Sequence, residues 1–360
     1  MITVRKELIY LTKQLILFKT TPENKKEIQN CFLFIQKYLK DTGLYLNTFN
    51  SKGTPSLLVS NSQTKSPDLL INGHIDVVEA SFNQFNPFIK DNKIYGRGAI
   101  DMKGSVAVIM LLMKNLPKNS SGKIVSLFVS DEEIDGENGT KYILSKRFKP
   151  KFTIIAEESN FDIIVQQKGG FVLNIKTYGK KAHSAEPWKG ENAIDKAIEI
   201  YQSFEKGLGT NKSALFKPTI NMGKFNGGTN ANFVADLASF DVDIRFTNKI
   251  EEKRIVDKIS SLKKKEDVKI TVRSYKRAMR SGGGKRQIEI LADLVKKIVG
   301  KTPIIKKTPY SGDGRFFTEY NLPVVEFGPV GANYHADNEY VKIDSLEKYY
   351  QMLDKFRRSL

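Results

Sequence analysis

The stretch Leu69-Leu70-Ile71-Asn72-Gly73-His74-Ile75-Asp76 decides how this chain is organised. Its first residues form a short apolar run, typical of a strand buried between two layers of helices, and the run leads directly to His74. In open α/β sheets, ligand-binding residues follow the carboxyl ends of strands. His74 and Asp76 also point to the same side of an extended segment. We therefore expect Asp76 to accept a hydrogen bond from the imidazole nitrogen that does not face a metal.

Acidic residues and a second histidine follow other apolar runs in the same way. Asp131-Glu132-Glu133 comes after the apolar run 125–129, and Glu157 comes after the run 153–155. The loop that carries His335 comes after the run 324–327. A glycine-rich turn at residues 96–104 places Asp101 ahead of an expected helix. Taken alone, each acidic motif is typical of a solvated turn or a helix N-cap. Together they bring imidazole and carboxylate, the ligand types of hydrolytic zinc, to one edge of a sheet.

The order of helix and strand signals indicates two domains. Helical periodicity at 4–18 and 23–40 is followed by short apolar strands, which predicts an α/β sheet. Residues 169–279 instead show the order β-α-β-β-α-β of the ferredoxin-like layout. We therefore predict a catalytic metal-binding domain formed by residues 1–168 and 280–360, with an inserted α+β lid domain at residues 169–279.

Composition narrows the class of protein. The chain has 360 residues, enough for two domains, and 40% of them are apolar. No apolar run approaches the roughly 20 residues of a membrane span, and the first residues, Met1 to Glu7, do not resemble a secretory signal. The single cysteine, Cys31, excludes an intrachain disulfide and is expected to be a small buried hydrophobe. We expect a cytoplasmic protein without a membrane partner.

The net charge of +18 is unusual for an enzyme. Part of it lies in a run without any acid: Arg273, Lys276, Arg277, Arg280, Lys285 and Arg286. Such a patch can attract nucleic acid or an acidic partner. The sequence contains no recognisable motif for reading DNA or RNA, so we favour a solvated surface over nucleic-acid binding.

At this point the ordered motifs resemble those of a known family. They are similar to the zinc amidohydrolases that include acetylornithine deacetylase, succinyl-diaminopimelate desuccinylase, the aminoacylases and glutamate carboxypeptidase. The motifs are Gly-His-x-Asp-Val-Val at 73–78, Gly-Arg-Gly-x-x-Asp-Met-Lys-Gly at 96–104 and Asp-Glu-Glu at 131–133. The resemblance implies a zinc-exopeptidase-like mixed sheet, an inserted lid through which a homodimer forms, and two divalent metal ions per chain. Zinc is expected, and cobalt or manganese would suit the same ligands.

The resemblance also implies a role for each motif residue. The metal ligands would be His74, Asp101, Glu133, Glu157 and His335, with Asp101 bridging both ions. Glu132 would act as the general base for a metal-bridged water, and Asp76 would support His74. The usual flanks of the Glu157 block are missing, so Glu158 remains a rival ligand. A cis peptide bond between Asp101 and Met102 is a further expectation.

The inserted domain carries the remaining implied site residues. His183, in Gly179-Lys180-Lys181-Ala182-His183-Ser184-Ala185-Glu186-Pro187, would reach the active site of the partner subunit and stabilise the oxyanion; the alternative is an ordinary edge-strand histidine. Asn232 would be the polar group of a glycine-rich loop. Arg245 has the fork shape that suits a substrate carboxylate, unless it is a plain strand arginine. Arg315, near the carboxyl end of the chain, would bind substrate or only support the rim of the site.

These observations favour a dinuclear hydrolase that cleaves the amide bond of an N-acyl amino acid, as a deacetylase or desuccinylase does, or of a small peptide. One rival is a non-catalytic basic binding protein with this fold, which metal analysis would separate from the enzyme. Another, suggested by the charge, is a hydrolase that releases an amino acid from an acidic amino-group carrier protein.

Overall fold

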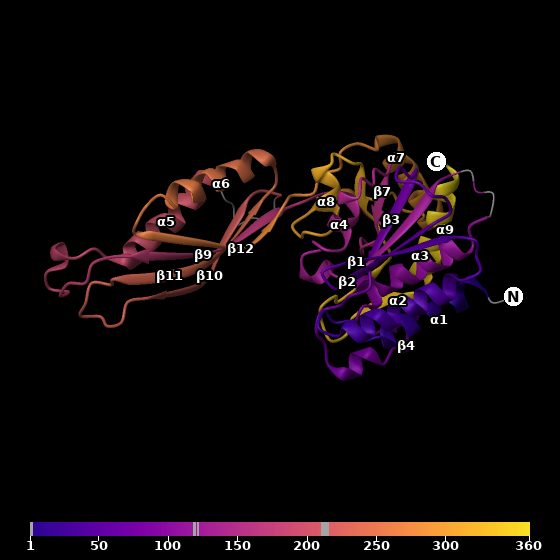
Figure 1. Ribbon diagram of the computed structural model, residues 1–360, viewed down its shortest axis with the longest axis horizontal. Helices are drawn as coiled ribbons and strands as arrows, with labels where there is room; N and C mark the ends of the chain where they lie inside the picture. Colours follow the sequence, from indigo (N-terminus) through magenta and orange to yellow (C-terminus); the bar gives the residue numbers. More distant parts are fainter. Residues whose placement is uncertain (1–2, 118–119, 121, 210–215) are drawn as a thin grey trace. The chain divides into compact units, whose positions relative to one another are not determined.

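The computed structural model describes residues 3–117, 120, 122–209 and 216–360 (Figure 1). Residues 1 and 2 of the amino-terminal segment discussed above lie outside this part. The chain forms two compact units. The first comprises Met1–Gln166, Arg280–Lys306 and Gly312–Leu360, and the second comprises Gln167–Met279 with Lys307–Ser311. The segment 307–311, which the sequence placed in the catalytic domain, thus packs with the second unit, where Lys168 N donates to Thr308 O over 3.3 Å.

The first unit is built on a mixed sheet. In the described residues its strand order is β1-β2-β6-β3-β7-β14-β8-β13. The strands are β1 (Tyr45–Ser51), β2 (Thr54–Ser60), β3 (Leu69–His74), β6 (Ile124–Val129), β7 (Thr153–Ile155), β8 (Ile163–Gln167), β13 (Ile305–Thr308) and β14 (Val324–Glu326). Neighbours β6, β3, β7 and β14 run parallel, while β1, β2 and β8 pair antiparallel. The four parallel strands therefore present their carboxyl ends along one edge, as the α/β prediction requires.

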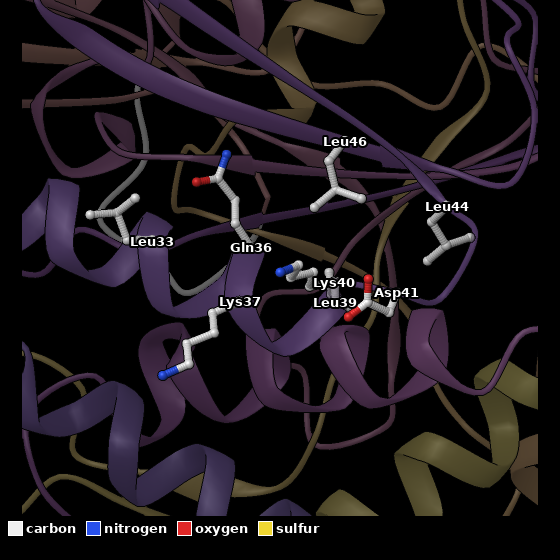
Figure 2. A pocket seen from close by; sticks show the side chains of 8 residues that line it. All are labelled: Leu33, Gln36, Lys37, Leu39, Lys40, Asp41, Leu44 and Leu46. Atoms are coloured by element: carbon white, nitrogen blue, oxygen red, sulfur yellow. The ribbon is translucent and has the colours of Figure 1, made fainter.

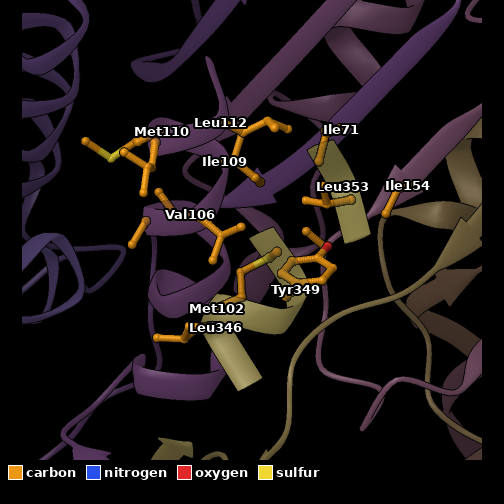
Figure 3. Close-up of a cluster of buried hydrophobic side chains, with 14 of the residues drawn as sticks. Ile71, Met102, Val106, Ile109, Met110, Leu112, Ile154, Leu346, Tyr349 and Leu353 are labelled. Atoms are coloured by element: carbon orange, nitrogen blue, oxygen red, sulfur yellow. The ribbon is translucent and has the colours of Figure 1, made fainter. Parts of the chain in front are cut away.

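Helices cover both faces of this sheet. The larger layer contains α1 (Val4–Leu17), α2 (Lys25–Leu39), α3 (Gly104–Lys114), α7 (Lys285–Val299) and α9 (Ile343–Arg358). Figure 3 shows Ile71 and Ile154 from neighbouring strands among apolar side chains of α3 and α9. Leu70, one residue earlier than Ile71, is also buried but lies outside this cluster, because successive strand side chains point to opposite faces. The helices α4 (Thr140–Ser145) and α8 (Gly314–Glu319) pack on each other, and α8 packs against β14.

Short elements at the rim of the first unit were not expected from the sequence. A separate sheet, with the order β15-β16-β5-β4, joins β4 (Phe88–Lys90), β5 (Lys93–Tyr95), β15 (Gly331–Ala332) and β16 (Tyr340–Lys342). Single helical turns are η1 (Phe82–Phe85), η3 (Glu132–Ile134) and, in the second unit, η4 (Pro187–Lys189), whereas the segment η2 (Ala99–Lys103) has a non-helical backbone at Asp101 and Met102. Strands of two or three residues are too short to show an alternating pattern. They matter here because β5 and β16 bring residues 93–95 beside 340–342.

The second unit has the predicted ferredoxin-like layout. Its elements follow the order β9 (Gly169–Tyr178), α5 (Ala193–Leu208), β10 (Thr219–Gly227), β11 (Leu237–Phe246), α6 (Lys249–Leu262) and β12 (Val268–Lys276). The sheet order is β10-β11-β9-β12, and neighbouring strands are antiparallel. Helices α5 and α6 pack on each other and on this sheet, and Figure 1 shows both on the same face. The mixed-sheet α/β fold with an α+β insertion is therefore confirmed.

Two compositional expectations can be compared with the structure. Cys31 lies in α2 with no exposed surface, and burial raises the pKa of its thiol to about 12, as expected for an inert apolar residue. Among the described residues, no helix combines the length and the apolar character that crossing a membrane requires.

Candidate metal centre

Strand ends place the acidic motifs and the first histidine next to one another. His74 is the last residue of β3 and lies beside Val129, the last residue of β6. Glu133 follows in the short helical turn η3, and Glu157 lies two residues beyond the end of β7. These three side chains therefore approach from adjacent parallel strands, which is why residues far apart in sequence can meet.

A first group of ligand atoms forms around the imidazole of His74. Its Nε2 lies 3.0 Å from Asp101 Oδ1 and 3.3 Å from Glu157 Oε1. All three donor atoms lie within 4.8 Å of one another. His74 is buried, and the two carboxylates are nearly so.

A second group forms around the imidazole of His335. Its Nε2 lies 3.1 Å from Asp101 Oδ2 and 3.3 Å from Glu133 Oε1. Asp101 thus offers one carboxylate oxygen to each group, which is the arrangement of a bridging ligand. The peptide bond between Asp101 and Met102 is cis, so the expectation for this bond is confirmed.

Asp76 contacts His74 in a different way from the one we expected. His74 Nδ1 lies 2.9 Å from the backbone carbonyl oxygen of Asp76 and 3.5 Å from its carboxylate Oδ1. The other carboxylate oxygen accepts a hydrogen bond from Glu133 N over 3.0 Å. A donor role for Nδ1 leaves Nε2 with a free lone pair facing the acids. Asp76 therefore supports a ligand of each group.

The donor set suits divalent cations. Each group combines one imidazole with two carboxylates, the mixture that zinc, cobalt and manganese accept. Metal–ligand bonds of about 2.0–2.2 Å at tetrahedral angles separate ligand atoms by roughly 3.3–3.6 Å, close to the distances above. Burial raises the pKa of Glu157 well above its usual range, since a buried carboxylate without a cation is costly. Hydrogen bonds to the carboxylates of Asp101 and Glu133 raise the pKa of the His335 imidazole to about 10.

Two further glutamates lie close to these groups. Burial raises the pKa of Glu132 to about 8 and that of Glu158 to about 9. Neither belongs to either ligand group, so the geometry favours Glu157 over Glu158 as the ligand. Within the described chain, the Glu132 carboxylate has no hydrogen-bond partner. It is therefore available for proton transfer.

Arg315, which we expected near the substrate, is only 3% exposed. Its Nη1 donates to Gly312 O over 2.8 Å and its Nη2 to Asp135 O over 2.5 Å. Its charge lowers the pKa of Glu132, against the larger effect of burial. Through Asp135, Arg315 therefore contacts the end of the turn that carries Glu132 and Glu133.

Sequence reasoning missed several residues that hold the site. Glu339 is buried and binds the backbone of the loop that carries Asp101. Asp313, also buried, accepts from Thr140 Oγ1 over 2.5 Å. Asp131 accepts from the backbone N–H groups of Asn138 and Gly139. Of these three residues, only Asp131 lies in a motif that the sequence analysis singled out, as the first residue of Asp131-Glu132-Glu133.

The second unit carries the other expected residues. His183 is exposed, and its Nδ1 accepts a hydrogen bond from Ala185 N over 3.1 Å. Asn232 is exposed in the loop after β10, and its carbonyl oxygen accepts from Ser184 N over 3.0 Å. The two loops therefore lie side by side, as the bridge between His183 and Phe233 also shows.

Arg245 is half-exposed on β11, also in the second unit. Its Nε and Nη2 donate to the two carboxylate oxygens of Asp243 over 2.6 and 2.7 Å. The guanidinium fork of Arg245 is therefore engaged by a carboxylate of the same strand.

A pocket elsewhere in the first unit does not coincide with the metal groups. It has a volume of about 480 Å³ and is lined by Leu33, Gln36, Lys37 and Leu39 of α2 and by Lys40, Asp41, Leu44 and Leu46, which follow this helix (Figure 2). None of the metal-facing residues lines it.

Comparison with known proteins agrees with this site. The model of Peptidase family M20/M25/M40 matches residues 70–358. Succinyl-diaminopimelate desuccinylase of Buchnera aphidicola subsp. Cinara cedri is 27% identical over 351 residues, which cover 90% of this chain and 93% of the relative. The protein of the same description from Wolbachia pipientis subsp. Culex pipiens is 28% identical over 377 residues, covering 97% and 92%.

Solved structures share the fold. A tripeptidase from Staphylococcus aureus superposes with a TM-score of 0.78 at 21% identity, covering 99% of this chain and 98% of that one. An aminopeptidase from Bacillus cereus gives 0.78 at 20% identity, with 98% of each chain covered. The family match spans most of the chain and includes every residue of the two ligand groups. The chain therefore belongs to peptidase family M20/M25/M40 and is a metal-dependent enzyme that hydrolyses amide or peptide bonds.

Proposed function

We propose that this protein is a dinuclear hydrolase that removes the succinyl group from an N-succinyl amino acid. The observation that carries the dinuclear part is the Asp101 carboxylate, which offers one oxygen to the His74 group and the other to the His335 group. The relatives named as desuccinylases support the substrate class, since they match nearly the whole chain.

The two ligand groups would hold the cations and leave Glu132 free. His74 and Glu157 would bind one cation, Glu133 and His335 the other, and Asp101 both. A bound pair of divalent cations would polarise the scissile carbonyl and lower the pKa of the attacking water. Glu132 would accept the proton of that water and deliver it to the leaving amine. Its half-buried carboxylate supports this role, because burial raises its pKa to about 8.

His183 would supply a donor to the oxyanion of the reacting amide. Because its Nδ1 accepts from Ala185 N, the neutral imidazole carries its proton on Nε2. The exposed Nε2–H group can therefore donate a hydrogen bond to an oxyanion without a change of tautomer. We propose that this donor acts in the partner subunit of a homodimer, which the inserted domain would form.

Arg245 would bind a carboxylate of the substrate, and Asn232, whose loop lies beside His183, would be a separate polar contact. An N-succinyl amino acid has a carboxylate at each end, which suits a guanidinium fork and a basic protein. Asp243 occupies the Arg245 fork here, so the substrate would have to share or displace this pair. Arg315, buried against two backbone carbonyls, would act on the catalytic turn instead of the substrate.

The test is hydrolysis by protein reconstituted with zinc, cobalt or manganese. We expect about two cations per chain, and turnover of N-succinyl amino acids well above that of N-acetyl amino acids and dipeptides. A protein that binds two cations but prefers dipeptides would overturn the substrate class. One cation at saturation would overturn the dinuclear site.

The dimer is tested by mixing two inactive variants. His183→Ala and Glu132→Gln should each lose activity, and a mixed dimer should regain part of it if His183 acts in the partner subunit. No recovery in a mixture shown to contain mixed dimers would contradict action across subunits.

A further inference from the structure

The buried carboxylate of Glu339 is fully used as a hydrogen-bond acceptor. Its Oε1 accepts from Ile100 N over 3.0 Å and from Asp101 N over 3.2 Å. Its Oε2 accepts from Gly98 N over 3.0 Å and from Arg97 Nη1 over 2.6 Å. Each oxygen therefore has two donors, and three of the four donors are backbone groups of one loop.

The Arg97–Glu339 pair is almost completely enclosed. Both side chains are buried, with 3% and 1% of their surface exposed. Removing one member of such a pair leaves the other as a buried, uncompensated charge. The backbone adds to the connection, since Gly96 N donates to Glu339 O over 3.1 Å.

Glu339 joins the two loops that supply the second ligand group. One is the loop of residues 96–104, which carries Asp101. The other is the loop of residues 333–338, which carries His335 and is exposed throughout. The His335 side chain is 48% exposed, and its backbone has a positive φ of 61°. By contrast, His74 ends a central strand of the sheet.

Hydrogen bonds within and beyond the exposed loop involve polar groups at its surface. Asn333 Nδ2 donates to Asn338 O over 3.3 Å within the loop, and Gln84 Nε2 donates to Asp337 Oδ1 over 2.8 Å. Glu339 is the charged residue at which this loop enters the interior and meets the Asp101 loop.

We propose that Glu339, held by Arg97, is the positioning residue that fixes the second cation group, Asp101–Glu133–His335, against the first. The inference rests on the proposed dinuclear function. Without Glu339 the His335 loop loses its buried attachment, whereas His74 and Glu157 stay in place at the ends of β3 and β7. The second cation should therefore be lost before the first.

Glu339→Gln tests this sharply. A glutamine side chain has one acceptor oxygen and one NH₂ group. In either orientation, its NH₂ group would face two of the N–H donors that now bind a carboxylate oxygen, so those hydrogen bonds would be lost. The matched control is Glu347→Gln. Glu347 is partly exposed on α9 and pairs with Arg5 over 2.6 Å, so the control removes the same charge from another glutamate–arginine pair that touches neither loop.

Protein that has been stripped of metal with a chelator is titrated with Co²⁺. Calorimetry and the visible absorption of the bound ion report how many equivalents bind and how tightly. Wild type and Glu347→Gln should bind two equivalents. Glu339→Gln should bind the first with near-normal affinity and the second at least about tenfold more weakly, the size of effect usual for residues that orient metal ligands.

The outcomes separate this inference from the proposed function. A wild type that binds only one equivalent refutes the dinuclear site. Two unchanged equivalents in Glu339→Gln, or equal weakening of both, refute the role of Glu339. If circular dichroism shows that Glu339→Gln is unfolded, Arg97→Gln replaces it, since the carboxylate then keeps its three backbone donors. That variant should weaken the second equivalent alone, and an unchanged second equivalent refutes the inference.

Discussion

Replacing Glu132 by glutamine should lower turnover strongly without disturbing the metal site. The Glu132 carboxylate belongs to neither ligand group and, in the described structure, has no hydrogen bond to lose. Glutamine has nearly the same shape but cannot accept a proton. We expect the rate to fall by about 10²–10⁴-fold, the usual contribution of a general base, or roughly 3–5 kcal/mol in the barrier.

The same substitution should not weaken the metal-free fold. Burial raises the pKa of Glu132 from its ordinary value to about 8, so the folded chain binds more protons than the unfolded chain between those two values. The stabilising effect of the protonated form is therefore present at low pH and lost as the pH rises toward 8. Glutamine stays neutral, so Glu132→Gln should match or exceed the wild type in the free energy of unfolding above pH 8.

The assay combines initial rates on an N-succinyl amino acid, cation content per chain and thermal unfolding. Glu137→Gln is the control, because Glu137 is exposed close to the same turn, pairs with Lys141 and should leave the rate unchanged. A Glu132→Gln protein that keeps its cations and works within about tenfold of the wild-type rate would refute the general-base assignment. Loss of a cation would show that Glu132 is a ligand instead.

Other substitutions test the remaining parts of the site and core. Asp101→Ala should lose both cations in metal analysis, since one carboxylate serves both groups, and unchanged content would contradict the bridge. Arg315→Met should lower kcat more than it raises KM for the substrate, because its guanidinium binds backbone carbonyls; a pure rise in KM would indicate substrate contact. Tyr349→Phe should cost about 1–3 kcal/mol in denaturant unfolding by leaving Phe327 O without its buried 2.6 Å donor, and an unchanged midpoint would count against that bond.

Much of the fold and the site could be predicted because the relevant signals are local. The apolar runs before His74 and Glu157 identify strands, and strand ends in an α/β sheet converge at one edge. The order of periodic segments after residue 169 likewise specified the ferredoxin-like unit. The short rim strands β4, β5, β15 and β16 were missed because, unlike the three-residue strands β7 and β14, they are not part of a longer apolar run, and two or three residues are too few to show a period.

By itself, the sequence determined which side chains could supply imidazole and carboxylate, and on which strands and loops they lie. Only the tertiary structure decided that Asp76 meets His74 through its carbonyl oxygen, that Arg315 is buried, and that Arg97 binds Glu339. The physical reason is that periodicity reports which face of an element is apolar. Hydrogen bonds between residues far apart in the chain depend on how the elements pack.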